Sequence, residues 1–455
     1  MYITGLKSFD MNSCTNRPLI LLWLMIFTGI LVTSCMESQD REKTNIVTIA
    51  EGFAETHVNA VIFRRNSISS YNGHQYVAFY DNSAYVILAK RKLGTNEWKI
   101  HQTQYKGNVG DAHNSISIMH DGDGYLHMSW DHHNDSLRYA VSRSPESTEM
   151  GPKMAMVGDT ENRVTYPEFY ALDNGDLVFV YRDGSSGNGN LVMNHYDPKS
   201  KTWKRVQSNL IDGEGERNAY WQMYIDNSGV IHVSWVWRET GDVATNHDIC
   251  YARSRNNGIS WETSTGEPYI LPINQGNAEY VLKIPQNSNL INTTSITADQ
   301  SGNPYIATYF KAEEDQVTQF KVLYKSDGNW KSSTVSNRKS DFVLGGRGTR
   351  SVPISRPQIV VQQKENEEVI HVIYRDEEYD NKVCIASTKI SGNLDWRINT
   401  LGEEAMSRWE PTYDTELWEN QQLLHLYYQV THQGSGETPV SSSPTMVSVM
   451  EIFLD

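Results

Sequence analysis

Hydrophobic and polar positions alternate with a period of two along most of this chain, and segments of helical period are almost absent. Tyr, Trp, Val and Ile are frequent in the alternating segments, and Asp, Asn and Gly separate them. A period of two places successive side chains on opposite faces of a strand, while Asp, Asn and Gly favour turns. The pattern therefore predicts an all-β protein.

One turn-and-strand unit recurs along the chain. Residues 121–130 contain the turn Asp-Gly-Asp-Gly and the strand Tyr-Leu-His-Met-Ser-Trp, and residues 226–235 repeat this order closely. Most copies are followed by a second strand, and residues 254–261 resemble the Asp-box turn of sialidase-like propellers, with Asn256 where Asp is usual. The seven copies, spaced roughly 45 to 75 residues apart, are 73–80, 121–130, 173–181, 226–235, 299–309, 369–374 and 422–428.

Seven such units predict a seven-bladed β-propeller of four-stranded antiparallel blades, in which each unit buries one face on the next. A pair of β-sandwiches or a β-helix is the alternative, but the repeat is too long for the turns of a β-helix. A repeat architecture also lets residues 36–455 form one domain, although they are too many for one ordinary core.

The N-terminus has the pattern of an export signal. An apolar run at 19–32 follows Arg17 and leads into Thr33-Ser34-Cys35. The run is short for a membrane span, and a cysteine after small residues resembles the bacterial lipobox. We expect residues 1–35 to be a lipoprotein signal, with lipidation of Cys35 and export to the outer membrane, the cell surface or the medium. An ordinary signal peptide or a short anchor is the alternative.

The formal net charge of −15 at pH 7 argues against nucleic acid as a partner. Beyond residue 35 the chain has two cysteines, Cys250 and Cys384, so disulfides are not its source of stability. We expect a monomer that meets a membrane only through the lipid at Cys35. An anionic ligand would need a local cationic patch on this acidic protein.

Such a patch is predicted at one face of the propeller, where the starts of first strands and the ends of second strands meet around the central channel. A histidine or a cation follows an aromatic residue at the end of the second strand in five consecutive repeats. Arginine binds carboxylate and sulfate with paired donors, and aromatic rings pack on sugar faces, so the patch suggests an anionic glycan. Salt bridges between blades are the alternative. The five segments are Trp130-Asp-His132-His133, Tyr181-Arg182, Trp237-Arg238, Tyr309-Phe310-Lys311 and Tyr374-Arg375.

Two reactions suit a glycan that contains uronate. Hydrolysis needs two carboxylic residues beside the bond, for which Asp111, Glu168 and Glu410 are the candidates. β-Elimination needs a cation that neutralises the uronate carboxylate, a base for the C5 proton and an acid for the departing O4. The predicted face is rich in His, Tyr and Arg, so the inventory favours elimination.

Five motifs carry a resemblance to a known family. In order, they are Gly110-Asp-Ala-His-Asn-Ser115, Trp130-Asp-His-His-Asn134, Thr165-Tyr-Pro-Glu-Phe169, Tyr181-Arg-Asp-Gly-Ser-Ser-Gly187 and Asn218-Ala-Tyr-Trp221. This set resembles the propeller ulvan lyases of polysaccharide lyase families 24 and 25, and family 25 more closely. The resemblance implies endolytic cleavage of ulvan, the sulfated rhamnose–uronate polysaccharide of green algae. A sialidase-like hydrolase and a non-catalytic glycan-binding lipoprotein remain alternatives.

The resemblance also implies roles for single residues. His113 and Tyr166 match the proton-transfer residues, with base and acid not distinguished, and Arg182 matches the arginine that neutralises the uronate. The implied substrate-binding residues are His133 or its neighbour His132, Tyr220 (with Tyr224 close by) and Arg238. The choice between glucuronate and iduronate stays open.

No cofactor is expected for the chemistry. His247 and Cys250 offer nitrogen and sulfur ligands three residues apart, and the resemblance suggests a structural zinc in this region. A buried free cysteine is the alternative at Cys250.

Overall fold

Strands dominate the part of the chain that is described by this computed structural model, residues 43–365, 367–391 and 394–454. The expected signal at 1–35 and its Cys35 lie outside these residues. Residues 41–455 form one compact unit. None of the helices in the described ranges has the length and apolar character needed to cross a membrane.

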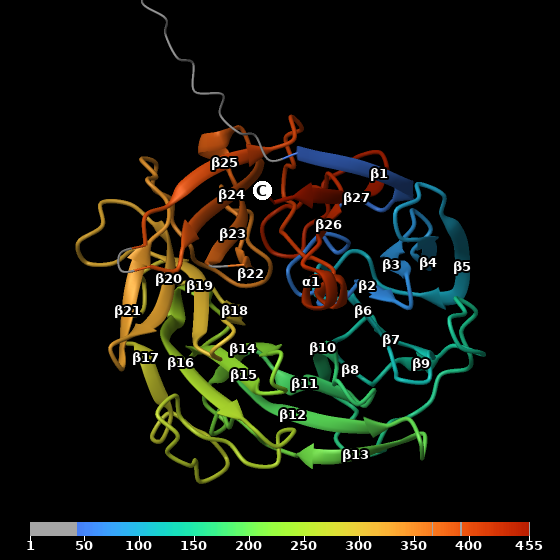
Figure 1. The fold of residues 1–455 in the computed structure, drawn as a ribbon, viewed down its shortest axis with the longest axis horizontal. Helices are drawn as coiled ribbons and strands as arrows, with labels where there is room; N and C mark the ends of the chain where they lie inside the picture. The colour runs from blue at the N-terminus through green and yellow to red at the C-terminus, as the bar shows by residue number, and fades with distance from the viewer. Residues whose placement is uncertain (1–42, 366, 392–393, 455) are drawn as a thin grey trace, which may run out of the picture. The chain divides into compact units, whose positions relative to one another are not determined.

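The strands form antiparallel sheets that follow one another around a ring from the N-terminal to the C-terminal end of the described chain (Figure 1). Three sheets have four strands each in sequence order. The first contains β2 (Ile68–Tyr71), β3 (His74–Tyr80), β4 (Tyr85–Lys92) and β5 (Lys99–Lys106). Another contains β18 (Ser295–Ala298), β19 (Pro304–Phe310), β20 (Gln319–Ser326) and β21 (Asn329–Thr334), and the third β22 (Gln358–Gln363), β23 (Glu368–Asp376), β24 (Lys382–Lys389) and β25 (Arg397–Leu401).

A nine-stranded sheet contains two further units of the same kind. A single parallel pair between β12 and β14 joins these two units, and β8 (His133–Asp135) adds to the edge. The first unit consists of β10 (Val164–Ala171), β11 (Leu177–Ser185), β12 (Asn188–Asp197) and β13 (Thr202–Gln207). The second consists of β14 (Asn218–Ile225), β15 (Ile231–Arg238), β16 (Asn246–Ser254) and β17 (Glu279–Leu282).

Two sheets have three strands. One contains β6 (Ile116–His120), β7 (Leu126–Trp130) and β9 (Tyr139–Val141). The other joins the two ends of the described chain, because β1 (Lys43–Gly52) pairs with β27 (Thr445–Phe453), which pairs with β26 (Leu424–Tyr428). This pairing closes the ring, because the first and last strands of the described chain belong to one sheet.

Each of the seven predicted repeats contains a strand at the predicted place, namely β3, β7, β11, β15, β19, β23 and β26. The turns before β7, β15 and β19 share one hydrogen-bonding pattern. Asp121 Oδ1 accepts from the amides of Asp123 and Tyr125, and Asp226 and Asp299 accept from the amides two and four residues later in the same way. The recurring aspartate is therefore explained by the turn it stabilises.

Two histidines of the repeats are part of these turns. His127 Nε2 lies 3.2 Å from Asp121 Oδ2, and His232 Nε2 lies 3.0 Å from Asp226 Oδ2. Each ring is fully buried, and its Nδ1 meets a tyrosine hydroxyl of the neighbouring strand. These histidines stabilise the blades and are remote from the candidate site.

The hydrophobic core lies between neighbouring sheets rather than at one centre. Met119 and Tyr139 of one sheet pack with Phe169, Phe179 and Trp203 of the next. Such stacking buries each sheet's apolar face on its neighbours.

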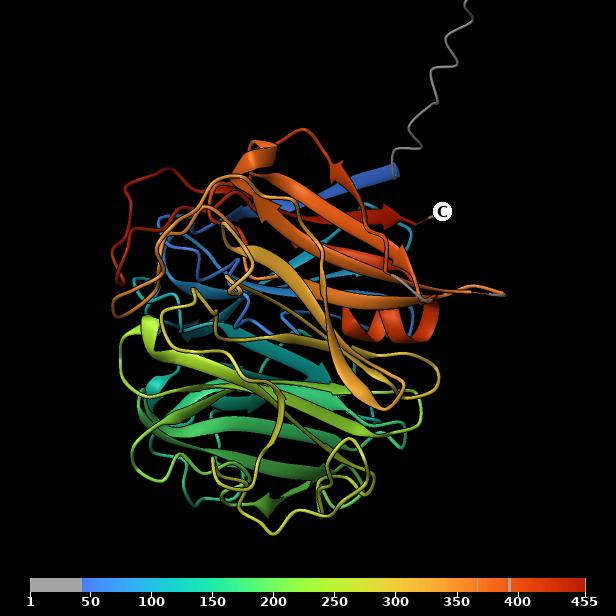
Figure 2. The same ribbon diagram turned by 90° about the vertical axis from the view of Figure 1, so that its left-hand side faces the viewer.

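Helix α1 (Thr415–Gln421) was not expected from the sequence. Asp414 caps its first turn by accepting from the amide of Leu417, and the same carboxylate accepts from the amide and hydroxyl of Ser70. The helix therefore forms where a long-range contact supports it. It lies toward the middle of the ring in Figure 1 and at one end of it in the side view of Figure 2. Two 3-10 turns, η1 (Val243–Thr245) and η2 (Glu377–Tyr379), complete the described elements.

Candidate active site

Side chains from the starts of β6, β10 and β14 meet at one end of the ring. His113 comes just before β6, Tyr166 is near the start of β10, and Tyr220 is near the start of β14. The ring of Tyr166 has its centroid 5.8 Å from that of His113 and 6.0 Å from that of Tyr220. Phe63, from the segment between β1 and β2, packs against both His113 and Tyr166.

Strand pairing adds two more of the expected residues. Thr165, the neighbour of Tyr166, pairs with His133 of β8 on one side and with Arg182 of β11 on the other. The sheet therefore brings together residues that are far apart in sequence.

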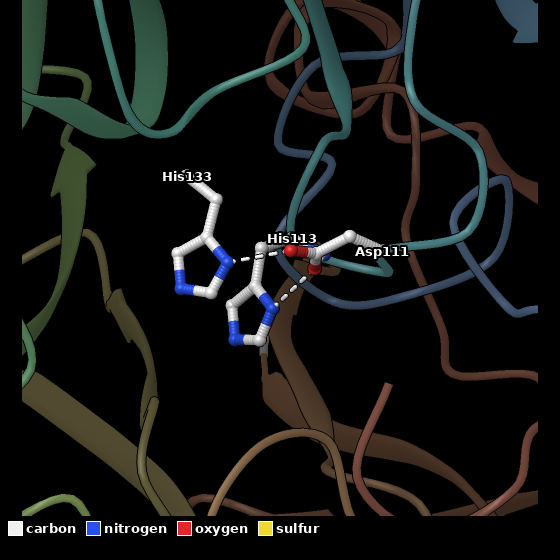
Figure 3. A group of neighbouring side chains, drawn as sticks. All are labelled: Asp111, His113 and His133. Carbon is white, nitrogen blue, oxygen red and sulfur yellow. Dashed lines mark hydrogen bonds and ion pairs between the residues drawn. The ribbon is translucent and has the colours of Figure 1, made fainter. Parts of the chain in front are cut away.

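Asp111 holds two histidines at this end of the ring. His113 Nδ1 lies 2.7 Å from Asp111 Oδ1, and His133 Nδ1 lies 2.6 Å from Asp111 Oδ2. Figure 3 shows both rings with Nδ1 toward the carboxylate and the other nitrogen away from it. If each Nδ1 donates a hydrogen bond to Asp111, both Nε2 atoms remain available for proton transfer with groups outside the cluster.

The two histidines have pKa values shifted in opposite directions. Burial alone would lower the pKa of His113, but hydrogen bonds to Asp111 and Glu437 raise it to about 9. Burial, together with the charge of His113, lowers the pKa of His133. Burial opposes ionisation of Asp111, yet its bonds to both histidines bring its pKa well below the ordinary value. At neutral pH the cluster therefore contains a charged His113, a neutral His133 and an ionised Asp111.

Tyr166 has an unusual backbone. Its φ of 54° lies in the left-handed region, and a β-bulge separates Thr165 from Glu168 in the pairing with β11. Such a conformation costs on the order of 1–3 kcal/mol for a non-glycine residue and is common at functional sites. Burial raises the pKa of Tyr166. No residue in the described ranges forms a hydrogen bond with its hydroxyl.

Arg182 has a buried and largely unsatisfied guanidinium. Its Nε donates to the carbonyl oxygen of Gly184 at 3.0 Å, whereas Nη1 and Nη2 have no partner in the described part of the chain. The guanidinium carbon lies 5.0 Å from the centre of the Tyr166 ring and 5.8 Å from that of Tyr220. A buried cation with two free donors is costly unless an anion binds to it.

Arg238 lies on the other side of Tyr220. Its Nη1 is 3.4 Å from the Tyr220 hydroxyl, and its remaining donors bond to the carbonyl oxygens of Thr240 and Gly241. Burial alone would raise the pKa of Tyr220, but Arg238 and Arg182 outweigh it and lower that pKa to about 7. Tyr220 is therefore far easier to ionise than an ordinary tyrosine.

A cavity of about 50 Å³ lies beside these groups. Phe63, His113, Tyr166 and Arg238 line one part of it, and Arg356 with Glu410 lines another. Arg356 binds Glu410 through two parallel contacts, Nε to Oε1 at 2.8 Å and Nη2 to Oε2 at 2.6 Å. Neither Arg182 nor His133 lines this cavity; Arg182 lies behind the tyrosine rings.

The structure resolves two ambiguities in the expected set. His133 belongs to the cluster, whereas His132 is fully buried and its Nε2 accepts from the amide of Arg138. The predicted contact of His132 with substrate stays a prediction, and His133 is the histidine of the pair that lies in the cluster. Tyr220 is in the site, while Tyr224 lies at the other end of β14 and donates to Glu419.

Some of the cations expected at this face are structural. Arg375 is fully buried, and its nitrogens bond to the backbone of Trp409 and Pro353 and to the side chain of Asn381. Lys311 pairs with Asp341 at 2.7 Å. Both follow the predicted aromatic residue in the repeat, but Arg375 is bound to the surrounding protein and Lys311 is paired with a carboxylate.

His247 and Cys250 do not form a metal site in the described chain. His247 Nε2 lies 2.8 Å from Glu239 and its Nδ1 lies 3.0 Å from Asp248, so both ring nitrogens already have carboxylate partners. Cys250 is a free, fully buried cysteine whose thiol pKa is raised by burial. The donor set thus does not fit zinc, and the interpretation of Cys250 as a buried free cysteine agrees with the structure.

Within the described ranges, the one group of three His, Cys, Asp or Glu ligand atoms lying within 4.8 Å of one another is Asp111, His113 and His133. The short Nδ1-to-carboxylate distances are those of hydrogen bonds, and we interpret the group as a hydrogen-bonded cluster.

Sequence reasoning missed Phe63 and Glu437. Glu437, from the loop before β27, lies 3.3 Å from His113 Nδ1 and also accepts from the amide and hydroxyl of Thr349. Phe63 lies in a buried loop that is not part of any of the seven repeats. No motif marks either residue, so only tertiary structure could identify them.

The fold is shared with solved polysaccharide lyases. The polysaccharide lyase Uly1 superposes with a TM-score of 0.66 at 16% identity, covering 91% of this chain and 100% of that one. A family 25 polysaccharide lyase, an ulvan lyase, gives a TM-score of 0.56 at 14% identity, covering 80% and 96%. That ulvan lyase has also been solved with -[GlcA(1-4)Rha3S]- bound.

Residues 74–338, more than half of the chain, match the BNR repeat-containing family, and the chain belongs to this family. Its curated relatives include distant ulvan lyases. The ulvan lyase of Nonlabens ulvanivorans is 22% identical over 336 residues, 62% of this chain and 69% of that protein. The long isoform of Glaciecola sp. (strain KUL10) is 24% identical over 190 residues, 31% of this chain. The match spans 19% of that isoform's length.

Proposed function

We propose that this protein is a polysaccharide lyase that cleaves ulvan by β-elimination at the uronate and leaves unsaturated uronate ends. One observation carries the proposal: two arginines without carboxylate partners, Arg182 and Arg238, lie beside the proton-transfer groups His113 and Tyr166. The similarity to ulvan lyases supports the choice of substrate.

The arginines supply the neutralising charge. A uronate carboxylate that meets Arg182 or Arg238 has its negative charge compensated, which acidifies the proton on C5. The free Nη1 and Nη2 of Arg182 match the two oxygens of a carboxylate. Arg238 lines the cavity directly, so substrate meets it first.

His113 is the acid. Its pKa of about 9 keeps the imidazole protonated at neutral pH, and its Nδ1 is bound to Asp111. Nε2 can then donate a proton to O4 as the C4–O4 bond breaks. The departing sugar leaves as an alcohol, and the ring carbons C4 and C5 of the uronate share the new double bond.

Tyr166 is the base. It is the other cavity-lining proton-transfer group, and its hydroxyl has no hydrogen-bond partner among the described residues. The positive charges of Arg182, Arg238 and Arg356 act against the burial that raises its pKa. The alternative base is Tyr220, which ionises more easily but does not line the cavity.

Hydrolysis is the less suitable reaction for this site. It needs a protonated carboxylic acid beside the bond. Glu410 is ionised by its contact with Arg356, and Asp111 is ionised by its two histidines. Glu168, whose pKa burial raises to about 7, accepts from Tyr170, away from the cavity-lining groups.

The deciding experiment is incubation with ulvan while ultraviolet absorbance and reducing ends are both followed. A lyase produces reducing ends together with the chromophore of unsaturated uronate. Reducing ends without the chromophore indicate a hydrolase, and binding without either indicates a lectin; both results contradict the proposal.

The remaining proposals concern architecture and location. We propose that the seven strand units are blades of one seven-bladed propeller that acts as a monomer, supported by the pairing of β1 with β27. We also propose export as a lipoprotein anchored at Cys35, supported by the apolar run at 19–32. Mass spectrometry of the mature N-terminal peptide tests the anchor, and an unmodified Cys35 contradicts it.

A further inference from the structure

A second cavity, of about 640 Å³, lies at the opposite ends of the strands that begin at the candidate active site. His113 precedes β6 and His120 ends it, and on β10 Tyr166 lies near the start and Tyr170 near the end. Four residues of strand span about 13 Å, so the two cavities are separate. Its lining includes Arg65, Tyr71, His120, Tyr224, Glu416 and Glu419.

This cavity has buried donors without partners. Arg65 is 5% exposed, and its Nε and Nη2 have no hydrogen-bond partner in the described chain. His120 is 4% exposed, and neither of its ring nitrogens has one. Unmatched buried polar groups are uncommon in folded proteins, and groups that line a cavity of this size indicate a polar ligand.

Acceptors lie opposite these donors. Glu416 and Glu419 of α1 line the cavity, and Tyr224 donates to Glu419 at 3.1 Å. Asp121, Asp173 and Asp226 add carboxylates to the wall. Burial, reinforced by neighbouring carboxylates, raises the pKa of both glutamates, so each can also donate a proton near neutrality.

The walls are held in place before a ligand binds. Asp414 ties the start of α1 to Ser70, and the hydroxyl of Thr415 donates to Asn66 Oδ1 at 2.8 Å. The ring of His120 stacks on Tyr71 at 4.8 Å. A preorganised wall lowers the ordering cost of binding.

We propose that this second cavity binds a neutral saccharide unit. A sugar hydroxyl both donates and accepts, so one ligand can satisfy Arg65 and His120 together with Glu416 and Glu419. An anion would face the carboxylates of Asp121, Asp173 and Asp226, and an ammonium compound would add a second positive charge beside Arg65. The Tyr71 ring offers a face on which a sugar can pack. The site is independent of the cleavage chemistry and adds a second glycan contact to the molecule.

The experiment measures binding of L-rhamnose and D-galactose by saturation-transfer NMR and calorimetry, with D-glucuronate and D-glucosamine as charged comparisons. We expect the neutral sugars to bind the wild-type protein and Tyr166→Phe equally. Glu416→Gln and Arg65→Lys should weaken binding at least about tenfold, because an amide cannot reproduce the hydrogen bonds of the carboxyl group and an ammonium lacks the paired donors of Arg65. The control is Glu313→Gln, at an exposed position, which should bind as the wild type does.

Glu416 is half-buried on a surface helix, so Glu416→Gln should fold even if Arg65→Lys does not. Circular dichroism verifies the fold of each variant. Absence of neutral-sugar binding, binding unaffected by Glu416→Gln, or stronger binding of a charged sugar would overturn the proposal. Loss of binding in Tyr166→Phe but not in Glu416→Gln would place the sugar in the candidate active site and would also overturn it.

Discussion

The imidazole rings of His113 and His133 stack with 4.0 Å between their centroids and 17° between their planes. One ring precedes β6 and the other begins β8, and both direct Nδ1 to Asp111. Two protonated imidazoles at this distance repel each other. The charge on one ring therefore lowers the pKa of the other, and their pKa values move apart. The stacked pair therefore provides one charged and one neutral histidine at the same pH.

Replacing Asp111 should shift the pH dependence of cleavage. His113 must be protonated to act as the acid, and Asp111 contributes to raising its pKa to about 9. Asp111→Asn removes that contribution, so His113 loses its proton at lower pH and the alkaline limb of kcat/KM moves toward neutrality. Initial rates on ulvan across pH 6–10 measure the shift, with Asp327→Asn, at an exposed carboxylate, as the control. An unchanged alkaline limb would remove His113 from the acid role.

Removing the Tyr166 hydroxyl should abolish most of the cleavage. Tyr166→Phe keeps the ring that packs on Phe63 but deletes the base, so kcat should fall by about 10²–10⁴ with little change in stability. Tyr125→Phe, at the protein surface, is the matched control. Comparison with Tyr220→Phe identifies the base, since a larger loss in Tyr220→Phe than in Tyr166→Phe would transfer the role to Tyr220.

The two unpaired arginines should both matter for the transition state. Arg182→Ala and Arg238→Ala should each lower kcat/KM by about 10²–10³, the range for one oxyanion-stabilising donor. Arg182→Lys should recover only part of the loss, because an ammonium lacks the paired donors. Steady-state kinetics on ulvan measure these values, and Arg255→Ala, whose side chain is mostly exposed, serves as the reference. A mild effect of Arg182→Ala combined with a severe effect of Arg238→Ala would assign neutralisation to Arg238 alone.

Chelation should leave the activity intact. In the proposed mechanism His113 and Tyr166 transfer the protons, and arginine side chains neutralise the uronate carboxylate. Dialysis against EDTA, followed by the ulvan assay and metal analysis of the protein, measures this. Loss of activity that added zinc or calcium restores would contradict this prediction and show that the protein needs a metal.

Breaking the buried ion pair beside the cavity should destabilise the fold. Arg356 and Glu410 are both buried and bind through two contacts. Glu410→Gln leaves Arg356 with an uncompensated charge, and the free energy of unfolding should fall by about 3–5 kcal/mol. Urea denaturation followed by tryptophan fluorescence measures the loss. A variant as stable as the wild type would indicate that solvent or another group compensates Arg356.

The alternation of residues along the chain determined most of the β structure. The repeated aspartate turns predicted β7, β15 and β19 at their places, because turn and strand formation depend on neighbouring residues. The repeat also indicated which strand ends carry His133, Arg182 and Arg238, since equivalent positions in a repeat face the same way.

Tertiary structure decided what local pattern cannot express. Residues from other strands decide whether the guanidinium of an arginine has hydrogen-bond partners. Arg182 Nη1 and Nη2 have none in the described chain, whereas Arg375 donates to backbone carbonyl oxygens. The same holds for α1, whose capping residue Asp414 is bound by Ser70 of β2, far away in the sequence. Glu437 reaches His113 from a loop more than three hundred residues away in the chain. Charge pairing, burial and the resulting pKa values are properties of contacts in space, so only the folded chain assigns them.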